Sequence, residues 1–209
     1  MDRILCLLAG YAFGLIQTGY LYGRINGIDI RQHGSGNSGT TNALRVLGKK
    51  AGLVVFIGDF LKTLIPCVAV RLLFREDMAT GYLLTLYTGF GVILGHNFPF
   101  YLKFKGGKGI AATAGILTAL DWRLMVTCLA AFVLVVAVSR FVSLGSLVVS
   151  AIFLAWNVLM AGQYQIPQDR VAEYYIAAAA ISGMAFWRHR ANIVRLVQGR
   201  ENKLWGGKK

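Results

Sequence analysis

The sequence predicts an all-α, polytopic integral membrane protein, and three of its features support that fold class. Hydrophobic residues make up 56% of the 209-residue chain, which is more than an ordinary soluble domain carries. The apolar residues gather into runs long enough to cross a bilayer, which takes about 20 residues per helix. The charged minority is basic, with 22 Lys and Arg against 9 Asp and Glu and a net charge of +13.

We predict seven transmembrane helices from these runs. In chain order they cover residues 4–23, 51–74, 79–95, 109–120, 124–138, 143–161 and 171–186. The run at 109–120 is short and rich in Ala and Gly, so it is either a buried helix or a re-entrant segment. Six spans is therefore the alternative count. We interpret the first run as a retained helix, because only Arg3 precedes it and no cleavage site follows.

The basic residues predict the orientation, since short cytoplasmic loops retain Lys and Arg. With seven spans, sixteen of the 22 cations fall on one side of the membrane. These are Arg24, Arg31, Arg45, Lys49, Lys50, Lys103, Lys105, Lys108, Arg140, Arg188, Arg190, Arg195, Arg200, Lys203, Lys208 and Lys209. We therefore expect the N-terminus outside and the C-terminus in the cytoplasm.

The chain shows no linker, repeat or second domain, so we expect one membrane-embedded domain over residues 1–209. Its cytoplasmic motif loops cover about 24–50, 96–108 and 139–146, and a tail covers 188–209. The charge favours an anionic partner. The candidates are nucleic acid, the anionic cytoplasmic lipid face and a phosphorylated substrate. We expect no nucleic acid, which is the least favoured of the three, because the cations lie between apolar runs and form no continuous basic stripe.

The first cytoplasmic loop holds three glycines and four hydroxyl residues in the nine positions of Gly34-Ser35-Gly36-Asn37-Ser38-Gly39-Thr40-Thr41-Asn42. Such a loop can direct backbone amides at an anion. A helix predicted to begin at Thr40 brings Arg45 and a helix N-terminus to the same place. A solvated turn is the alternative reading of this loop alone. A nucleotide P-loop is excluded, because Thr40 stands where that motif needs Lys.

The second loop ends in Lys105-Gly106-Gly107-Lys108-Gly109. Two lysines bracket two glycines there, which indicates a second cradle for an anion. Lysines that flank a span are also the ordinary positive-inside signal, but that signal requires no glycines. His96, at the end of the preceding span, is either a structural hydrogen-bonding residue or a catalyst.

Two polar residues lie inside an apolar run, Asp59 and Lys62, and their spacing of three places them on one helix face. We expect an internal ion pair facing the helix bundle, with direct catalysis as the less favoured alternative. The three cysteines lie in apolar runs, and their spacing indicates neither a disulfide framework nor a metal site.

The remaining motifs are Arg140-Phe141-Val142-Ser143-Leu144-Gly145-Ser146 and Arg188-His189-Arg190-Ala191-Asn192. Both add cations and hydrogen-bond donors. Residues 188–198 predict an amphipathic helix on the anionic leaflet.

Four segments together resemble the PlsY family of bacterial acyl-phosphate:glycerol-3-phosphate acyltransferases: GSGNSGTTNALRVLGKKAG, GHNFPFYLKFKGGKG, RFVSLGS and RHRANIVRLVQGRENKL. The resemblance runs from the first span to the tail, and departs at Gln17-Thr18, Gly145 and Ala191. It implies transfer of an acyl group from acyl phosphate to the 1-hydroxyl of glycerol 3-phosphate, which yields lysophosphatidic acid and inorganic phosphate. This is an early step of bacterial phospholipid synthesis.

The resemblance also implies a multi-pass protein of the bacterial plasma (inner) membrane, with seven helices and an active site open to the cytoplasm. Its partners would be acyl phosphate, glycerol 3-phosphate and membrane lipid. A functional link to the enzyme that makes acyl phosphate follows. No cofactor and no metal are expected.

The site residues that we predict fall into two groups. The catalytic candidates are Ser35, Arg45, His96, Lys105 and His189. The candidates for binding substrate or phosphate are Gly34, Gly36, Asn37, Ser38, Thr41, Asn42, Gly106, Gly107, Lys108, Ser143 and Asn192. Which cradle holds which substrate stays open.

An acyl phosphate is already activated, so no covalent enzyme intermediate is required, and position and charge can suffice. The base is His96, His189 or, slightly favoured, the donor's own phosphate. The His-x4-Asp acyltransferase class is excluded, because no His is followed by Asp at that spacing. The alternative function is a transporter for organic phosphate or lipid. It is disfavoured, because transport requires polar groups near the bilayer midplane and here they lie at one face.

Overall fold

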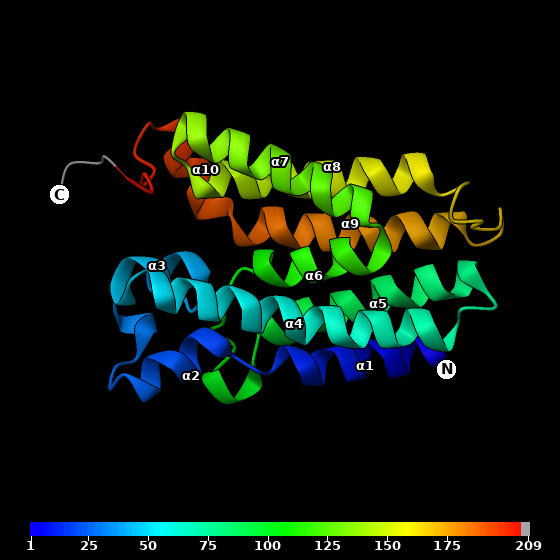
Figure 1. The fold of residues 1–209 in the computed structure, drawn as a ribbon, viewed down its shortest axis with the longest axis horizontal. Helices are drawn as coiled ribbons and strands as arrows, with labels where there is room; N and C mark the ends of the chain where they lie inside the picture. Colours follow the sequence, from blue (N-terminus) through cyan, green and yellow to red (C-terminus); the bar gives the residue numbers. More distant parts are fainter. Residues whose placement is uncertain (206–209) are drawn as a thin grey trace. The chain divides into compact units, whose positions relative to one another are not determined.

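The structure, a computed structural model, describes residues 1–205, which form helices joined by turns, bends and irregular segments, with no strand among them (Figure 1). The all-α prediction is therefore confirmed for the described residues. They divide into two compact units, Met1–Leu120 and Asp121–Lys209. The prediction of a single membrane domain over 1–209 stays a prediction. Lys208 and Lys209, which we assigned to the cytoplasmic tail, lie outside the described residues.

The first unit is a helical bundle built from α1, α4, α5 and α6, with shorter helices at one end (Figure 1). Its elements are α1 (Asp2–Gly14), α2 (Thr18–Ile25), the 3-10 helix η1 (Ile30–Gln32), α3 (Thr40–Leu47), α4 (Lys49–Leu73), α5 (Met78–Asn97), the 3-10 helix η2 (Phe100–Leu102) and α6 (Ile110–Leu120). Because only a short connection joins α4 to α5, α5 ends near the place where α4 begins.

Glycines allow α1 and α5 to pack with their backbones nearly in contact. A Cβ on Gly10 would lie 2.1 Å from the carbonyl oxygen of Thr88, and one on Gly91 would lie 2.2 Å from that of Leu7. Small residues at such an interface are the usual means by which helices associate in a membrane, where lipid is as apolar as the side chains.

The first apolar run, predicted as one helix over residues 4–23, is broken into α1 and α2, so its predicted continuity is wrong. The break lies at Gln17, whose side-chain nitrogen is 3.1 Å from the carbonyl oxygen of Gly14, 3.2 Å from that of Gly95 and 3.1 Å from that of His96. Gln17 thus donates to carbonyls at the end of α1 and near the end of α5.

The second unit consists of α7 (Trp122–Ser139), α8 (Val142–Met160), α9 (Val171–Arg188) and α10 (Arg190–Val197). α8 packs against both α7 and α9. Between α8 and α9, Tyr174 donates a hydrogen bond to Asn157 (2.5 Å) and Ser182 to the carbonyl of Ser150 (2.8 Å). The predicted helix at 188–198 is present as α10.

Five segments of the described chain are long and apolar enough to cross a membrane: Asp2–Ile25, Lys49–Leu73, Met78–Leu102, Trp122–Ser139 and Val142–Met160. Large apolar side chains such as Leu61, Ile65 and Leu134 are exposed on them. Such faces are stable against lipid rather than water. α6 and α9, where two further spans were expected, are helices but not among these five, so the seven-span count and the orientation stay predictions.

Candidate functional site

The first glycine-rich loop is held in shape by the buried side chain of Asn42. Its Oδ1 accepts a hydrogen bond from the backbone N–H of Ser35 (2.8 Å), and its Nδ2 donates to the carbonyls of Ile30 (3.1 Å) and His33 (3.0 Å). A Cβ on Gly34, where φ is +60°, would lie 2.3 Å from Asn42 Oδ1. The structure therefore explains Asn42 and Gly34 by loop shape, and their role in binding substrate stays a prediction.

Two hydroxyls of this loop are buried without a hydrogen-bond partner among the described residues, those of Ser38 and Thr40. Ser38 is fixed because its carbonyl oxygen lies against Gly19, where a Cβ would come within 1.8 Å. Ser35 is exposed and Thr41 is half-buried. A buried unpaired hydroxyl is costly unless a water or ligand satisfies it. This end of the first unit therefore has donors available for a bound group.

The start of α3 agrees with the predicted helix. Asn37 Oδ1 accepts a hydrogen bond from the N–H of Gly39 (2.9 Å), the residue that precedes the helix, and Gly36 adopts a left-handed φ of +72°. Thr41 and Arg45 are four apart and share a helix face. Arg45 lies in the last turn of α3 rather than its first, and it is exposed.

The glycines of the second loop bond back onto α5. The N–H of Gly106 donates to the carbonyl of Asn97 (3.2 Å), and that of Gly107 to the carbonyl of His96 (3.1 Å). A Cβ on Gly106 would lie 2.0 Å from the His96 carbonyl oxygen, and one on Gly107 2.0 Å from His96 Nε2. The amides of these two glycines therefore satisfy the last carbonyls of α5. The predicted anion cradle of this loop stays a prediction. Close approach accounts for both glycines.

In the second loop, the groups that could still contact an anion are therefore the lysine side chains. Lys105 is exposed and Lys108 half-buried, on either side of the bonded glycines. Asn97, which the motif pattern did not single out, is fully buried, and neither side-chain atom has a partner among the described residues. Gly109 packs against it, because a Cβ there would lie 3.2 Å from its Oδ1.

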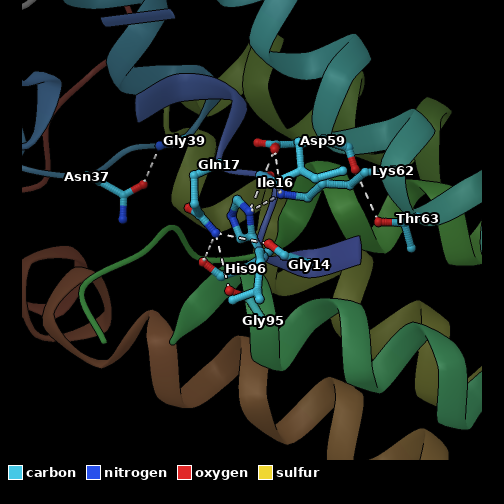
Figure 2. Close-up of polar contacts among 12 residues, drawn as sticks. Gly14, Ile16, Gln17, Asn37, Gly39, Asp59, Lys62, Thr63, Gly95 and His96 are labelled. Atoms are coloured by element: carbon cyan, nitrogen blue, oxygen red, sulfur yellow. Dashed lines mark hydrogen bonds and ion pairs between the residues drawn. The ribbon is translucent and has the colours of Figure 1, made fainter. Parts of the chain in front are cut away.

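His96 lies beneath this loop in a buried polar cluster (Figure 2). Its Nδ1 is 2.8 Å from Nζ of Lys62, which forms a 2.8 Å ion pair with Asp59 and donates to the carbonyl of Ile16 (2.6 Å). The internal Asp59–Lys62 ion pair predicted from spacing is confirmed. Lys62 also contacts His96, which belongs to α5.

The two loops lie at the same end of the first unit (Figure 1). Arg31 bonds to the carbonyl of Leu102 (3.4 Å), and the hydroxyl of Tyr101 donates to the carbonyl of Leu15 (2.6 Å). Arg31 also forms a 2.7 Å ion pair with Asp29. The hydrogen bond from the Arg31 side chain lowers the pKa of the Asp29 carboxyl. These contacts join η1 and the end of α1 to η2, so the segments that carry the two loops lie at the same end of the unit. The site assigned to the loops stays a prediction.

The remaining predicted residues lie in the second unit, where two of them bind the carboxylate of Glu201. Ser143 donates to Glu201 Oε1 (3.0 Å), Asn192 donates to the same oxygen (2.6 Å) and Arg195 donates to Oε2 (2.8 Å). Burial raises the pKa of Glu201, but these hydrogen bonds outweigh it and the pKa lies below its ordinary value. Sequence reasoning missed Glu201; its only signal was a lone acid in a basic tail.

His189 is also buried in the second unit. Its Nδ1 lies 2.7 Å from the carbonyl oxygen of Ala185. Because a carbonyl can only accept, Nδ1 carries a proton, and in the neutral ring Nε2 is then the acceptor.

Among residues 1–205, no group of three His, Cys, Asp or Glu side chains is placed to hold a metal ion. The cysteines Cys6, Cys67 and Cys128 are free thiols.

Comparison with known proteins gives a consistent result. The sequence profile of a family described as glycerol-3-phosphate acyltransferase matches residues 4–199. A glycerol-3-phosphate acyltransferase of Clostridioides difficile is 41% identical over 209 residues, covering 96% of this chain and 95% of the relative. One of Paramagnetospirillum magneticum is 37% identical over 210 residues, covering 100% and 97%.

Two crystal structures of PlsY, an integral membrane glycerol 3-phosphate acyltransferase, are similar along nearly the whole chain. The glycerol 3-phosphate form has a TM-score of 0.84 at 31% identity, covering 99% of this chain and 96% of that one. The lysophosphatidic acid form has a TM-score of 0.81 at 32% identity, covering 97% and 95%. This likeness, together with the apolar helices, identifies a multi-pass membrane protein.

Proposed function

The chain belongs to the glycerol-3-phosphate acyltransferase family, and we propose that it uses acyl phosphate as donor and the 1-hydroxyl of glycerol 3-phosphate as acceptor. The products are lysophosphatidic acid and inorganic phosphate. One observation carries the proposal: the first unit gathers two cationic loops at one end, each beside buried polar groups that have no partner among the described residues. Two phosphate-bearing substrates require two such places.

The first of these places takes one phosphate through Arg45 and the hydroxyls of Ser35, Ser38 and Thr41. Guanidinium groups suit the bidentate oxygens of a phosphate. Asn37, Asn42, Gly34 and Gly36 contribute by holding the loop in shape.

The second place takes the other phosphate through the ammonium groups of Lys105 and Lys108. A lysine acts on phosphate as a point charge. Gly106 and Gly107 allow the lysines to stand close to the end of α5. The experiment with alanine variants described below determines which phosphate binds at which place.

The chemistry needs little beyond position and charge. The 1-hydroxyl oxygen attacks the carbonyl carbon of the acyl phosphate, the bond from that carbon to the phosphate oxygen breaks, and phosphate leaves with the electron pair. Because the acceptor hydroxyl itself attacks the acyl carbon, no covalent enzyme intermediate forms. The hydroxyl proton passes to the donor's own phosphate. Arg45 and Lys105 stabilise the charge that develops on the leaving group.

The roles predicted for Ser143, Asn192 and His189 belong to the same proposal. The hydroxyl of Ser143 and the amide of Asn192 are donors, and both hold a carboxylate in the second unit.

The exposed apolar faces of α1 and α4 fit a location in the bacterial plasma membrane. The acyl tail of the donor then lies in the bilayer beside the cationic loops. The excess of Lys and Arg on those loops supports a site at the cytoplasmic face.

An activity assay tests the donor. Purified protein in detergent receives glycerol 3-phosphate with acyl phosphate, acyl-CoA or acyl carrier protein thioester, and lysophosphatidic acid is measured. Of the three donors, we expect only acyl phosphate to give lysophosphatidic acid. Product from a thioester without acyl phosphate contradicts the donor assignment, and no product from any donor contradicts the reaction.

Alanine variants test the two phosphate places. We expect Arg45→Ala and Lys105→Ala each to reduce kcat/KM by about 10²-fold or more, which is the scale for losing a charged transition-state contact. Lys103→Ala is the matched control, because Lys103 is exposed on the same loop. The substrate whose KM rises in each variant assigns its place. Rates close to those of the control in both variants refute the site.

A further inference from the structure

Lys62 joins three parts of the first unit, although it lies inside an apolar helix. Its side chain is 2% exposed, and its Nζ lies 2.6 Å from the carbonyl oxygen of Ile16, 2.8 Å from Oδ1 of Asp59 and 2.8 Å from Nδ1 of His96 (Figure 2). An ammonium group carries three hydrogens and no lone pair. Its contacts with the Ile16 carbonyl and with His96 are hydrogen bonds, and its contact with Asp59 is an ion pair. The Ile16 carbonyl belongs to the break in the first span.

This geometry determines which nitrogen of His96 carries the proton. Facing an ammonium, Nδ1 must accept, so the neutral ring carries its hydrogen on Nε2. The alternative places the proton on the imidazole and leaves Lys62 neutral. It is disfavoured, because the nearby carboxylate of Asp59 stabilises the charged form of Lys62. Asp59 also lies nearer to Lys62 Nζ (2.8 Å) than to His96 Nδ1 (3.7 Å).

The Nε2 side of the ring faces the glycine loop. A Cβ on Gly107 would lie 2.0 Å from Nε2, so the ring occupies the space of a side chain there. The carbonyl of His96 also accepts the N–H of Gly107. The loop thus contacts His96 both at its ring and at its backbone.

We propose that Asp59 and Lys62 are positioning residues which hold His96 as an Nε2–H hydrogen-bond donor toward the Lys105–Lys108 loop. His96 then supports the loop and does not act as the base of the acyl transfer. This rests on the proposed function only in taking that loop to hold phosphate. The proton acceptor is then the donor's own phosphate, as in the proposed function.

The tautomer can be measured without any activity. The chain has three histidines, so protein labelled with ¹⁵N-histidine gives a simple NMR spectrum, which His33→Gln and His189→Gln assign. We expect His96 to show the Nε2–H tautomer at neutral pH and His189 the Nδ1–H tautomer. An Nδ1–H or doubly protonated His96 overturns the proposal. This result is independent of whether acyl phosphate is the donor.

Substitution of His96 separates a donor from a base. The side-chain nitrogen of Gln can take the place of Nε2–H, but it cannot accept a proton. We expect His96→Gln to keep kcat within roughly tenfold and His96→Ala to lose more, whereas loss of a general base costs about 10²–10⁴-fold. Equal losses of that size in both variants overturn the proposal.

Lys62→Met tests the positioning role, with Lys50→Met as control because Lys50 is exposed on the same helix. We expect Lys62→Met to give His96 a mixture of tautomers and a lower kcat, and Lys50→Met to change neither. If Lys62→Met does not fold, the double variant Asp59→Leu/Lys62→Met removes both buried charges and serves instead. A pure Nε2–H signal with wild-type kcat in either variant contradicts the role of Lys62.

Discussion

Gly107 packs directly against His96 and lies in the loop to which we assign phosphate binding. In Gly107→Ala the new methyl group would lie 2.0 Å from Nε2 of His96, a buried ring that Lys62 holds from its other side. Since the ring cannot move away freely, the loop must shift. We expect kcat/KM to fall about tenfold or more and stability to fall by about 1–3 kcal/mol, as overpacking does. Steady-state kinetics and thermal unfolding in detergent measure both.

Gly183→Ala is the control for that substitution. Gly183 lies in α9, and nothing stands within 4 Å of a Cβ placed on it. Alanine there is expected to stabilise by up to about 1 kcal/mol, through helix propensity alone. If the two variants behave alike, the loop does not approach α5 as closely as described.

Single residues also mark the limit of prediction from the sequence. The spacing of Asp59 and Lys62 predicts their ion pair, because a helix fixes which side chains share a face. The contact with His96 is 34 positions away in sequence and depends on how α4 packs against α5. For the same reason the glycines at 106 and 107 read as an anion cradle, although their amides bond to α5.

Among the elements, the broken first span is the one that the sequence does not reveal. Its apolar run is continuous, and Gln17 is its only marked polar interruption near the break. In Gln17→Ala the carbonyls of Gly95 and His96 lose their side-chain donor in a buried place. We expect a loss of stability of about 1–3 kcal/mol, measured by thermal unfolding.

The control for Gln17→Ala is Gln32→Ala, because Gln32 is exposed in the same unit. The free energy of unfolding of this control is expected to lie within about 0.5 kcal/mol of that of the parent protein. A Gln17→Ala variant as stable as this control would mean that the break does not depend on the glutamine side chain.

The tail after α10 gives a prediction of pH dependence. Glu201 has a lowered pKa in the folded protein, so folding favours its ionised form. Its contribution to stability is present above its ordinary pKa of about 4.3 and is lost as the pH falls through the lower folded value. We expect Glu201→Gln to lower Tm at pH 7 and to flatten the decline of Tm below about pH 5. Parallel Tm curves for variant and parent across that range contradict this.

For the whole molecule, the sequence predicts membrane insertion well, because apolar runs can be recognised without knowing any tertiary contact. Orientation is a different matter, because it depends on the charge of the connecting segments and on the number of spans. The exposed residues Glu76, between α4 and α5, and Lys103, after η2, stand at opposite ends of α5. They therefore report on opposite faces of the membrane.

Cysteine labelling tests this orientation. After replacement of Cys6, Cys67 and Cys128 by Ala, the variants Glu76→Cys and Lys103→Cys are treated with a membrane-impermeant maleimide in intact cells. We expect Glu76→Cys to react and Lys103→Cys to react only after the cells are opened, because the lysine-rich loop stays in the cytoplasm. The reverse pattern would place the cationic loops outside. Acyl phosphate made in the cytoplasm could then not reach these loops. The labelling result therefore also tests the proposed reaction.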